Sequence, residues 1–452
     1  MLTIEEIVKA TKGELIQGNL NDTVSNFQID SRPVTEESFY CPILGEKVDG
    51  QKFIMDCARK HCKGFFVSDM NYVDVDNVDK DTAIIKVANT KQALIDIGVY
   101  NREKHREMEV VAITGSVGKT STREMVNSVL KEHFDTLSTM KNMNSHIGMP
   151  LITLMMDKQE LAILEAGVDF DGEMDILNKL LIPSVAVVTN IGTSHIGKFG
   201  SQDNIYKEKI KIANNLVDKK TLLLNKDDPY LAKYENPNIH IIYYGLDDAK
   251  NIKYNPTSIE FDTNIYNKEE HVVINAIGNH NVINSIIAIR IAELYNLTTK
   301  EIINGISKYT NYEKRMNAYE ASGMHLIDDT YNASPSSTES GLRTVEMIAP
   351  GRKIAVLADI LELGDYSQKI HSDLGEVFKE LSYDVVIAFG NDIKYLVESA
   401  SKYVPNIYMY NNSKEAEEKL RDIMRPNDTI YFKGSRSMNV SEIVDNIRRD
   451  FE

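Results

Sequence analysis

The sequence predicts an α/β protein of three domains, with a central nucleotide-binding domain built on a mostly parallel sheet. Short β-branched segments, among them 110–114, 185–189 and 354–358, alternate with helical stretches, as in sheets whose parallel strands are joined by crossover helices. The 452 residues are about three times the length of an average domain. A glycine loop that follows the segment 110–114 marks the central domain.

The first unit comprises residues 1–106. Thr3 and Glu6 have the spacing of a capping box, so we expect the chain to open with a helix and not with a signal peptide. The charged run 102–107 is interpreted as a solvated helix end and linker.

The second unit, 107–312, ends in a helical stretch over 274–312, and the third unit, 313–452, is expected to be Rossmann-like. Both units alternate buried strands with helices, which is why we assign each of them a mostly parallel sheet. The first unit contains short apolar runs at 63–67 and 83–87. The strands expected in the second and third units are 110–114, 161–164, 185–189, 221–224, 324–327, 354–358, 385–389 and 429–432.

Composition excludes several classes of protein. The chain has 51 basic and 67 acidic residues and a net charge of −16, whereas nucleic-acid binders neutralise phosphates with a basic face. It has no run of 18 apolar residues, so we expect no membrane insertion. Three cysteines, Cys41, Cys57 and Cys62, are too few for a disulfide framework and are expected to be reduced thiols. We therefore expect a soluble, cytoplasmic monomer.

The most informative segment, 113–122, has the pattern of a phosphate-binding loop: a strand runs into Gly-x-x-Gly-Lys-Thr, and a helix over 123–131 follows. Glycines let successive backbone N–H groups point at one anion, and the helix N-terminus adds its dipole. The full Walker pattern has a glycine at the position of Ile113, so a plain glycine-rich turn is the alternative. The residues expected to bind ATP in this loop are Gly115, Ser116, Val117, Gly118, Lys119, Thr120 and Ser121.

Three residues further along the chain are candidate metal ligands. Glu165 follows the strand 161–164 and His195 comes just after the next strand, so both lie at the sheet edge where open α/β sheets bind ligands. The alternatives are an exposed acid at a strand end and a structural histidine. Lys209 lies in a helix rich in lysine, and composition alone indicates a solvated charged face there.

Taken together, these residues resemble the Mur ligase family, the ATP-dependent enzymes that form amide bonds in peptidoglycan precursors. The resemblance reaches all three units. The segments 328–335 and 433–436 look like the type that adds D-alanyl-D-alanine to a UDP-N-acetylmuramoyl-tripeptide, the MurF type. The other segments that carry the resemblance are Thr114–Thr120, Glu165–Gly167, Thr189–Gly192 with His195, and Gly278–Asn281 with Asn284.

The resemblance implies a mechanism through an acyl phosphate. ATP phosphorylates the terminal carboxylate of the UDP-linked peptide, and the amine of D-alanyl-D-alanine then displaces phosphate. It also implies two magnesium ions, held by Thr120, Glu165, His195 and Lys209, and many members carry a carbamylated lysine at the place of Lys209. The resemblance thus assigns three residues to catalysis, namely Lys119, His195 and Lys209.

The resemblance further assigns contacts outside the loop. Two of these segments also have a structural alternative to an ATP contact. His280 and Asn281 could cap the N-terminus of a helix, and Asp329 could cap a local turn. His146 stands where family members often have Glu or Gln. The implied ATP contacts are His280, Asn281, Asn284, Arg315 and Asp329, and the implied contacts to the UDP substrate are Ser31, Arg32, Asn142 and Asn144.

Three other interpretations compete with this one. Folylpolyglutamate synthase shares the phosphate loop but has no N-terminal UDP unit with Asp-Ser-Arg, which this chain has at 30–32. Ligases of the MurE type that add diaminopimelate carry Asp-Asn-Pro-Arg, which is absent here. A P-loop ATPase module would hydrolyse ATP without both substrates. The third residue of the accepted tripeptide, lysine or diaminopimelate, stays open.

Overall fold

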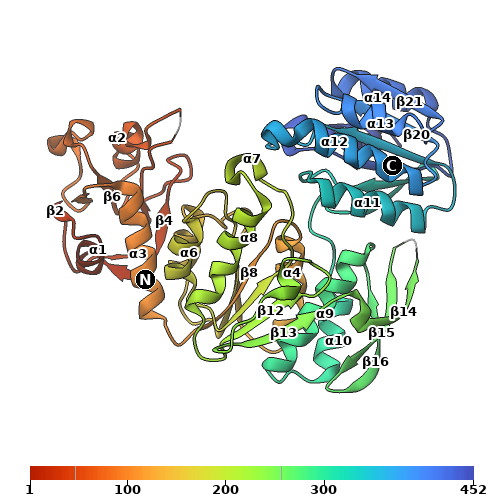
Figure 1. Ribbon diagram of the computed structural model, residues 1–452. Helices are drawn as coiled ribbons and strands as arrows, with labels where there is room; N and C mark the ends of the chain where they lie inside the picture. Colours follow the sequence, from red (N-terminus) through yellow and green to blue (C-terminus); the bar gives the residue numbers. More distant parts are fainter. Residues whose placement is uncertain (46, 256, 452) are drawn as a thin grey trace.

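A computed structural model describes residues 1–45, 47–255 and 257–451, which form three α/β lobes in chain order (Figure 1). The N-terminal lobe (red to orange) and the C-terminal lobe (teal to blue) flank the central lobe (mostly yellow to green). The predicted fold class is confirmed, and each predicted strand matches an observed strand to within one residue at either end. No helix among the described residues is both long and apolar enough to cross a membrane.

The N-terminal lobe is built on a five-stranded sheet in the order β2-β7-β6-β5-β4, in which only β2 is antiparallel to its neighbour. The predicted capping box is present, because Thr3 and Glu6 bond each other's backbone N–H groups at the start of α1. The elements are β1 (Leu2–Thr3), α1 (Ile4–Thr11), β2 (Glu14–Gln17), β3 (Thr23–Val24), β4 (Asn26–Gln28), β5 (Ser38–Tyr40), α2 (Ile54–Ala58), β6 (Gly64–Val67), β7 (Ala83–Lys86) and α3 (Thr90–Lys104).

The central lobe holds a six-stranded, fully parallel sheet in the order β13-β12-β11-β8-β10-β9. Successive residues of a strand face opposite sides, so Val110 and Ala112 enter one hydrophobic core while Val111 and Ile113 enter the other. Its elements are β8 (Glu109–Thr114), α4 (Lys119–Leu130), β9 (Thr136–Ser138), α5 (Gly148–Thr153), β10 (Leu161–Glu165), α6 (Glu173–Leu181), β11 (Val185–Val188), α7 (Ile196–Phe199), α8 (Gln202–Ile210), β12 (Thr221–Asn225) and β13 (His240–Tyr244).

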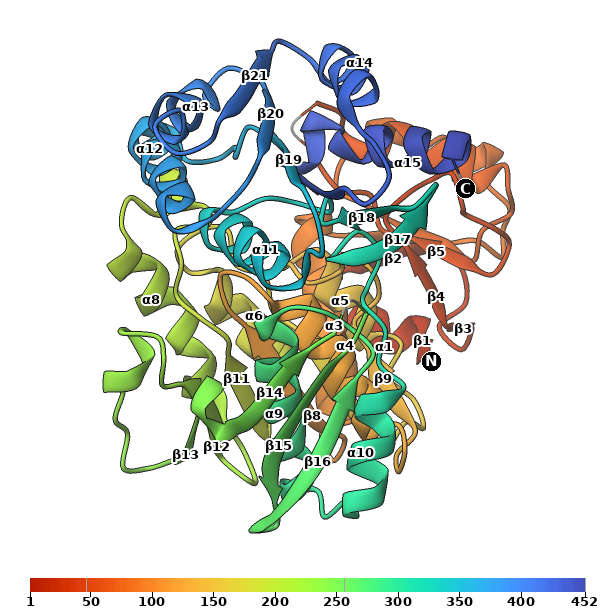
Figure 2. The same ribbon diagram turned by 90° about the vertical axis from the view of Figure 1, so that its right-hand side faces the viewer.

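The expectation of one helical stretch over 274–312 is wrong. Two helices form, α9 (Asn279–Leu294) and α10 (Thr299–Ser307), because the chain turns at Asn296 in the left-handed region and Thr298 caps a new helix with Glu301. An antiparallel sheet that the sequence did not predict packs against these helices (Figure 2). Its strands are β14 (Ala249–Tyr254), β15 (Ile259–Ile265) and β16 (Lys268–Ile274).

The C-terminal lobe is a Rossmann-like sheet in the order β17-β18-β22-β19-β20-β21, parallel except for β17. Helices cover it on both faces, as expected for a sheet whose strands are buried on both sides. Its elements are β17 (Asn317–Ala321), β18 (Met324–Asp328), α11 (Pro335–Ile348), β19 (Lys353–Ala358), α12 (Ser367–Glu376), β20 (Val385–Phe389), α13 (Lys394–Ala400), β21 (Asn406–Tyr410), α14 (Ser413–Ile423), β22 (Thr429–Lys433) and α15 (Val440–Phe451).

Two local expectations need correction. The run 102–107 is not uniformly solvated: Arg102 is only 1% exposed and donates to the carbonyl oxygens of Leu181 and Ile182 at the end of α6. The helix expected over 123–131 begins at Lys119, directly on the glycine loop. Its first turn therefore points its free N–H groups into the loop.

Candidate functional site

The phosphate loop lies at the carboxyl end of β8, between the ends of β11 and β10. Gly115 and Gly118 have φ angles of 149° and 84°, and a Cβ on Gly115 would lie 1.9 Å from Thr189 Oγ1. Lys119 Nζ folds back and donates to the carbonyl oxygens of Gly115 (2.8 Å) and Ser116 (3.3 Å). Burial lowers the pKa of Lys119, and the nearby positive charge of Arg315 lowers it as well, against the carboxylate of Glu165.

A residue that the sequence analysis did not single out holds this loop in shape. The Asn190 side chain accepts from Val117 N and donates to Val117 O, both at 3.0 Å, and the backbone carbonyl oxygen of Asn190 accepts from Ser116 N. Gly192 N donates to Ser116 Oγ at 2.8 Å. The loop is therefore braced from the end of β11.

Thr120 and Glu165 meet at the start of α4. Thr120 Oγ1 donates to Glu165 Oε2 at 2.9 Å, and Asn144 Nδ2 donates to Glu165 Oε1 at 2.8 Å. Arg123 Nη1 lies 3.5 Å from Glu165 Oε2, with both side chains almost fully buried. A hydroxyl and a carboxylate oxygen at this separation are the hard ligands that magnesium prefers, so the residues fit one such ion.

His195 and Lys209 form a second part of the site. His195 Nε2 lies 3.4 Å from Asp169 Oδ1, and His195 Nδ1 lies 2.7 Å from Glu362 Oε2 of the C-terminal lobe. Burial lowers the pKa of His195, while the two carboxylates oppose that shift. Lys209 is 2% exposed, so the solvated face suggested by composition is wrong, and burial together with the charge of Lys119 lowers the pKa of Lys209 to about 7.

These metal candidates do not form a ready-made cluster. Among the described residues, no group of three or more His, Cys, Asp and Glu side chains is arranged to hold a metal ion. The second part fits a divalent cation only if Lys209 supplies an oxygen, because a protonated amine repels the ion. His195 offers its ring nitrogens there, which face the carboxylates of Asp169 and Glu362.

Three of the residues expected to contact ATP, His280, Asn281 and Asn284, lie at the start of α9. Asn281 Nδ2 donates to Ile277 O, while Asn281 Oδ1 is buried without a partner. Asn284 Oδ1 accepts from Thr122 at 2.7 Å, while its Nδ2 is buried without a partner. One hydrogen-bond acceptor, Asn281 Oδ1, and one donor, Asn284 Nδ2, therefore remain free to bind a nucleobase edge that carries both donors and acceptors. Gly278 is the N-cap of α9 and no side chain caps it, which excludes the cap suggested for 280–281.

Arg315 and Asp329 come from the C-terminal side. Arg315 Nη2 donates to Thr120 Oγ1 at 3.2 Å, and the guanidinium lies 4.1 Å from the centre of the Tyr331 ring. Asp329 Oδ2 accepts from Lys433 Nζ at 2.5 Å. The local turn is capped by Asp328 and not by Asp329, as the bonds from Thr330 to Asp328 show.

The residues expected to bind the UDP substrate fall into two places. Arg32 pairs with Asp30 at 2.5 Å on the N-terminal lobe, where Lys60 Nζ donates to Ser31 O. Asn144 bonds Glu165 within the site, and Asn142 contacts the Tyr331 hydroxyl of the C-terminal lobe. The asparagine loop therefore reaches both the metal candidates and the opposite lobe.

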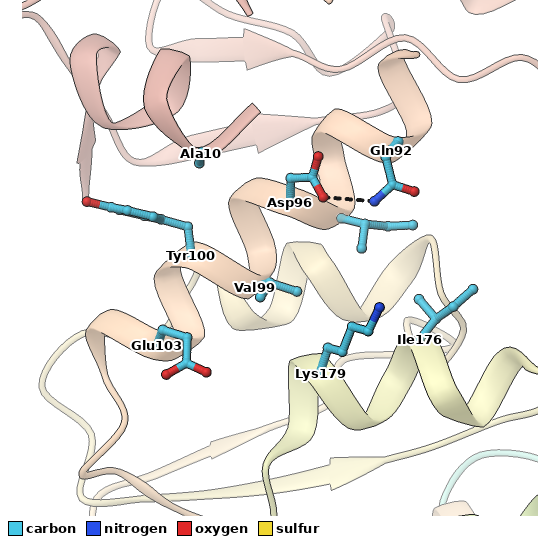
Figure 3. Close-up of a pocket in the computed structure, with 9 residues that line it drawn as sticks. Ala10, Gln92, Asp96, Val99, Tyr100, Glu103, Ile176 and Lys179 are labelled. Atoms are coloured by element: carbon cyan, nitrogen blue, oxygen red, sulfur yellow. Dashed lines mark hydrogen bonds between the residues drawn. The ribbon is translucent and has the colours of Figure 1, made fainter. Parts of the chain in front are cut away.

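A separate pocket of about 390 Å³ lies between the N-terminal and central lobes (Figure 3). It is lined from α3 and α6, and Lys179 points from α6 toward α3, where Gln92 donates to Asp96. None of the residues predicted for the site lines this pocket. The candidate site is therefore defined by the convergence of side chains at the sheet edge and not by this pocket.

Two models of known protein families match this chain. Residues 113–292 match the model of the Mur ligase middle domain, and residues 314–436 match that of the Mur ligase glutamate ligase domain. The UDP-N-acetylmuramoyl-tripeptide–D-alanyl-D-alanine ligase of Bacillus subtilis (strain 168) is 30% identical, over 98% of this chain and 97% of that protein. The protein of the same name from Borreliella burgdorferi is 26% identical over 99% of this chain and all of its own length.

Solved structures are similar over the same span. A crystal structure of MurF from Acinetobacter baumannii has a TM-score of 0.91 and 29% identity, covering 99% of this chain and 98% of that one. MurF ligase from Thermotoga maritima, solved in complex with ADP, shares the fold with a TM-score of 0.83 at 24% identity, covering 94% of this chain and 97% of that one.

Proposed function

The chain belongs to the Mur ligase family, and we propose that it uses ATP to join D-alanyl-D-alanine to a UDP-N-acetylmuramoyl-tripeptide in peptidoglycan precursor synthesis. One observation carries the proposal: the ends of two neighbouring strands, β8 and β10, bring Lys119, Thr120 and Glu165 together, and Arg315 reaches them from the C-terminal lobe. The similarity to ligases of that name over the full length supports the choice of substrates.

The reaction explains why such a site is needed. A carboxylate is a poor electrophile, so the terminal phosphoryl group of ATP is transferred to a carboxylate oxygen and ADP leaves. The amine of D-alanyl-D-alanine then attacks the carbonyl carbon, an amide bond forms, the amine loses a proton and inorganic phosphate departs. Lys119, with Arg315 opposite, offers positive charge to the transferring group, and the loop N–H groups orient it.

We assign two magnesium ions to this site. Thr120 and Glu165 would hold one, and His195 with Lys209 the other. Magnesium, when bound, neutralises the phosphate and carboxylate charges that must approach each other. The adjacent hydroxyl and carboxylate oxygens support the first assignment.

Lys209 is proposed to be carbamylated. Its burial and a pKa of about 7 leave a large neutral fraction at neutral pH, and only the neutral amine attacks carbon dioxide. A bond forms between Nζ and the carbon, one proton is released, and an anionic oxygen ligand results. Intact-protein mass spectrometry with and without bicarbonate measures this added mass of one carbon dioxide.

We propose that the domains divide at 1–106 for the UDP substrate, 107–312 for ATP and 313–452 for the Rossmann-like unit. The sheets support these limits, since among the described residues no sheet has strands on both sides of a limit. Cys41, Cys57 and Cys62 are buried and unpaired, which is compatible with a cytoplasmic location. The proposed monomer is tested by light scattering after size exclusion.

In the test, purified protein is incubated with ATP, magnesium, D-alanyl-D-alanine and a UDP-muramoyl-tripeptide whose third residue is lysine or diaminopimelate. The masses of the products are then measured by mass spectrometry. We expect amide product and phosphate release only when both substrates are present. Lys119→Ala should lower the rate by about 10³-fold or more, because it removes a charge that acts on the transferring group. Lys131→Ala, an exposed lysine at the far end of α4, is the control. ATP hydrolysis without either substrate would contradict the proposal.

A further inference from the structure

We propose that Glu173 is a positioning residue that holds together the two loops flanking the reacting groups. The inference rests on the proposed function and concerns the same site. The first loop comprises residues 140–148 and contains the asparagines expected to meet the UDP substrate. The second comprises residues 166–172 and follows the strand that ends in Glu165.

Glu173 is a buried acid whose two oxygens are both used. It is the first residue of α6 and is 1% exposed. Its Oε1 lies 2.5 Å from His146 Nδ1 and accepts from His146 N at 3.2 Å, while its Oε2 accepts from Asp169 N at 2.8 Å. A buried carboxylate is costly unless it is paired and hydrogen-bonded, and the N-terminus of α6 also favours its negative charge. One side chain thus joins one residue from each loop.

Both loops reach the site through other residues. The first loop supplies Asn144, which donates to Glu165, and its carbonyl accepts from Gly167 N of the second loop at 2.8 Å. The second loop supplies Asp169, whose carboxylate lies 3.4 Å from His195 Nε2. A movement of either loop therefore moves a partner of a proposed metal ligand, and Glu173 restrains both.

His146 is the side chain that pairs with the buried acid from the first loop. An imidazole donates to Glu173, whereas a glutamate in its place would repel the buried acid. The ring also packs edge-on against Phe170 of the second loop, with 5.2 Å between ring centres. The two loops are therefore joined twice, through the hydrogen bonds of Glu173 to His146 and Asp169 and through this contact between aromatic rings. The phosphate loop has its own brace in Asn190, so loss of the connection should spare ATP binding.

The test compares His146→Ala, His146→Gln, Glu173→Gln and the double variant His146→Ala/Glu173→Gln, with Asp175→Asn as control. Asp175 lies on the same helix but is half exposed and pairs with Lys211. We expect His146→Ala to raise KM for the UDP-linked peptide and lower kcat, by about tenfold in kcat/KM, with an unchanged Kd for ATP. His146→Gln, which can still donate to Glu173, should recover most of the loss, and the double variant should be no worse than the poorer single one.

A second readout is independent of ligation. Hydrogen exchange of residues 140–148 and 166–172 should become faster in both loops of the His146→Ala and Glu173→Gln variants, and stay as in the wild type in the control. Exchange confined to one loop, an equal loss of ATP affinity, or unchanged kinetics of His146→Ala would overturn the proposal. An inactive wild-type protein would instead refute the proposed function, and the exchange measurement would still decide the role of Glu173.

Discussion

Single side chains in this protein change their chemistry because of where the fold places them. Lys209 and His280 are ordinary titratable residues in the sequence, yet burial lowers the pKa of Lys209 to about 7 and that of His280 to about 4. The causes lie on other segments: Lys119 acts on Lys209, and Lys433 and Arg315 act on His280. No spacing within the sequence reveals such effects, because the charges meet only after folding.

His280 gives a prediction on pH and stability. Its pKa in the unfolded chain is near 6.5 and in the folded protein about 4, so between these values the unfolded state binds more protons. The free energy of unfolding should therefore fall as the pH drops from 6.5 toward 4, by up to about 3 kcal/mol from this group. In His280→Gln that part of the pH dependence should vanish. Urea unfolding of both proteins at pH 7, 6, 5 and 4 measures the difference, and parallel curves would contradict the assignment.

At the scale of elements, strands were predicted more accurately than helices and loops. Buried strands such as β8 and β20 are continuous runs of apolar residues bounded by polar ones, so their ends are visible in the sequence. The strands of the antiparallel sheet β14–β16 were missed, because they alternate apolar with charged residues and cover helices with one face only. The break between α9 and α10 depends on one left-handed asparagine and a capping box. The apolar residues on both sides have helical spacing, so the sequence predicted a helical stretch without this break.

Arg102 shows how two helices of different lobes are fastened. Its guanidinium donates to the carbonyl oxygens of Leu181, Ile182 and His105, which ties the end of α3 to the end of α6. Arg102→Ala should lower the free energy of unfolding by about 2–4 kcal/mol, because buried carbonyl groups lose their donors. Arg106→Ala, an exposed arginine paired with Glu103, should change it by less than about 0.5 kcal/mol. Urea unfolding checks both values, and equal effects would refute the role of Arg102.

At the scale of the whole molecule, the site is complete only when the central and C-terminal lobes meet. Arg315 crosses to Thr120, Glu362 approaches His195, and Tyr366 donates to Gly200 O at 2.8 Å. Gly197 and Gly364 lie at the same junction, where a Cβ on Gly364 would come within 3.3 Å of Gly197 Cα. These contacts couple the arrangement of the lobes to the chemistry.

Weakening that junction should slow the reaction without affecting nucleotide binding. The double variant Glu362→Gln/Tyr366→Phe removes a charge and a hydrogen bond that cross between the lobes, so we expect a larger radius of gyration by X-ray scattering and a kcat reduced about tenfold. Its Kd for ATP should stay unchanged. Tyr395→Phe, on α13 of the same lobe, serves as control. A wild-type kcat in the double variant would show that these contacts do not control closure.

The sequence by itself determined the class of fold, the eight predicted strands, the phosphate loop and the family resemblance. It could do so because these depend on local patterns: apolar runs, glycines at a strand-to-helix turn, and short motifs. The tertiary structure decided which residues act together. Four residues that the sequence shows only as ordinary polar ones surround the site: Asn190, Asp169, Glu173 and Glu362. They come together for two reasons. Parallel strands bring their carboxyl ends to one edge of the sheet, and the central and C-terminal lobes meet there.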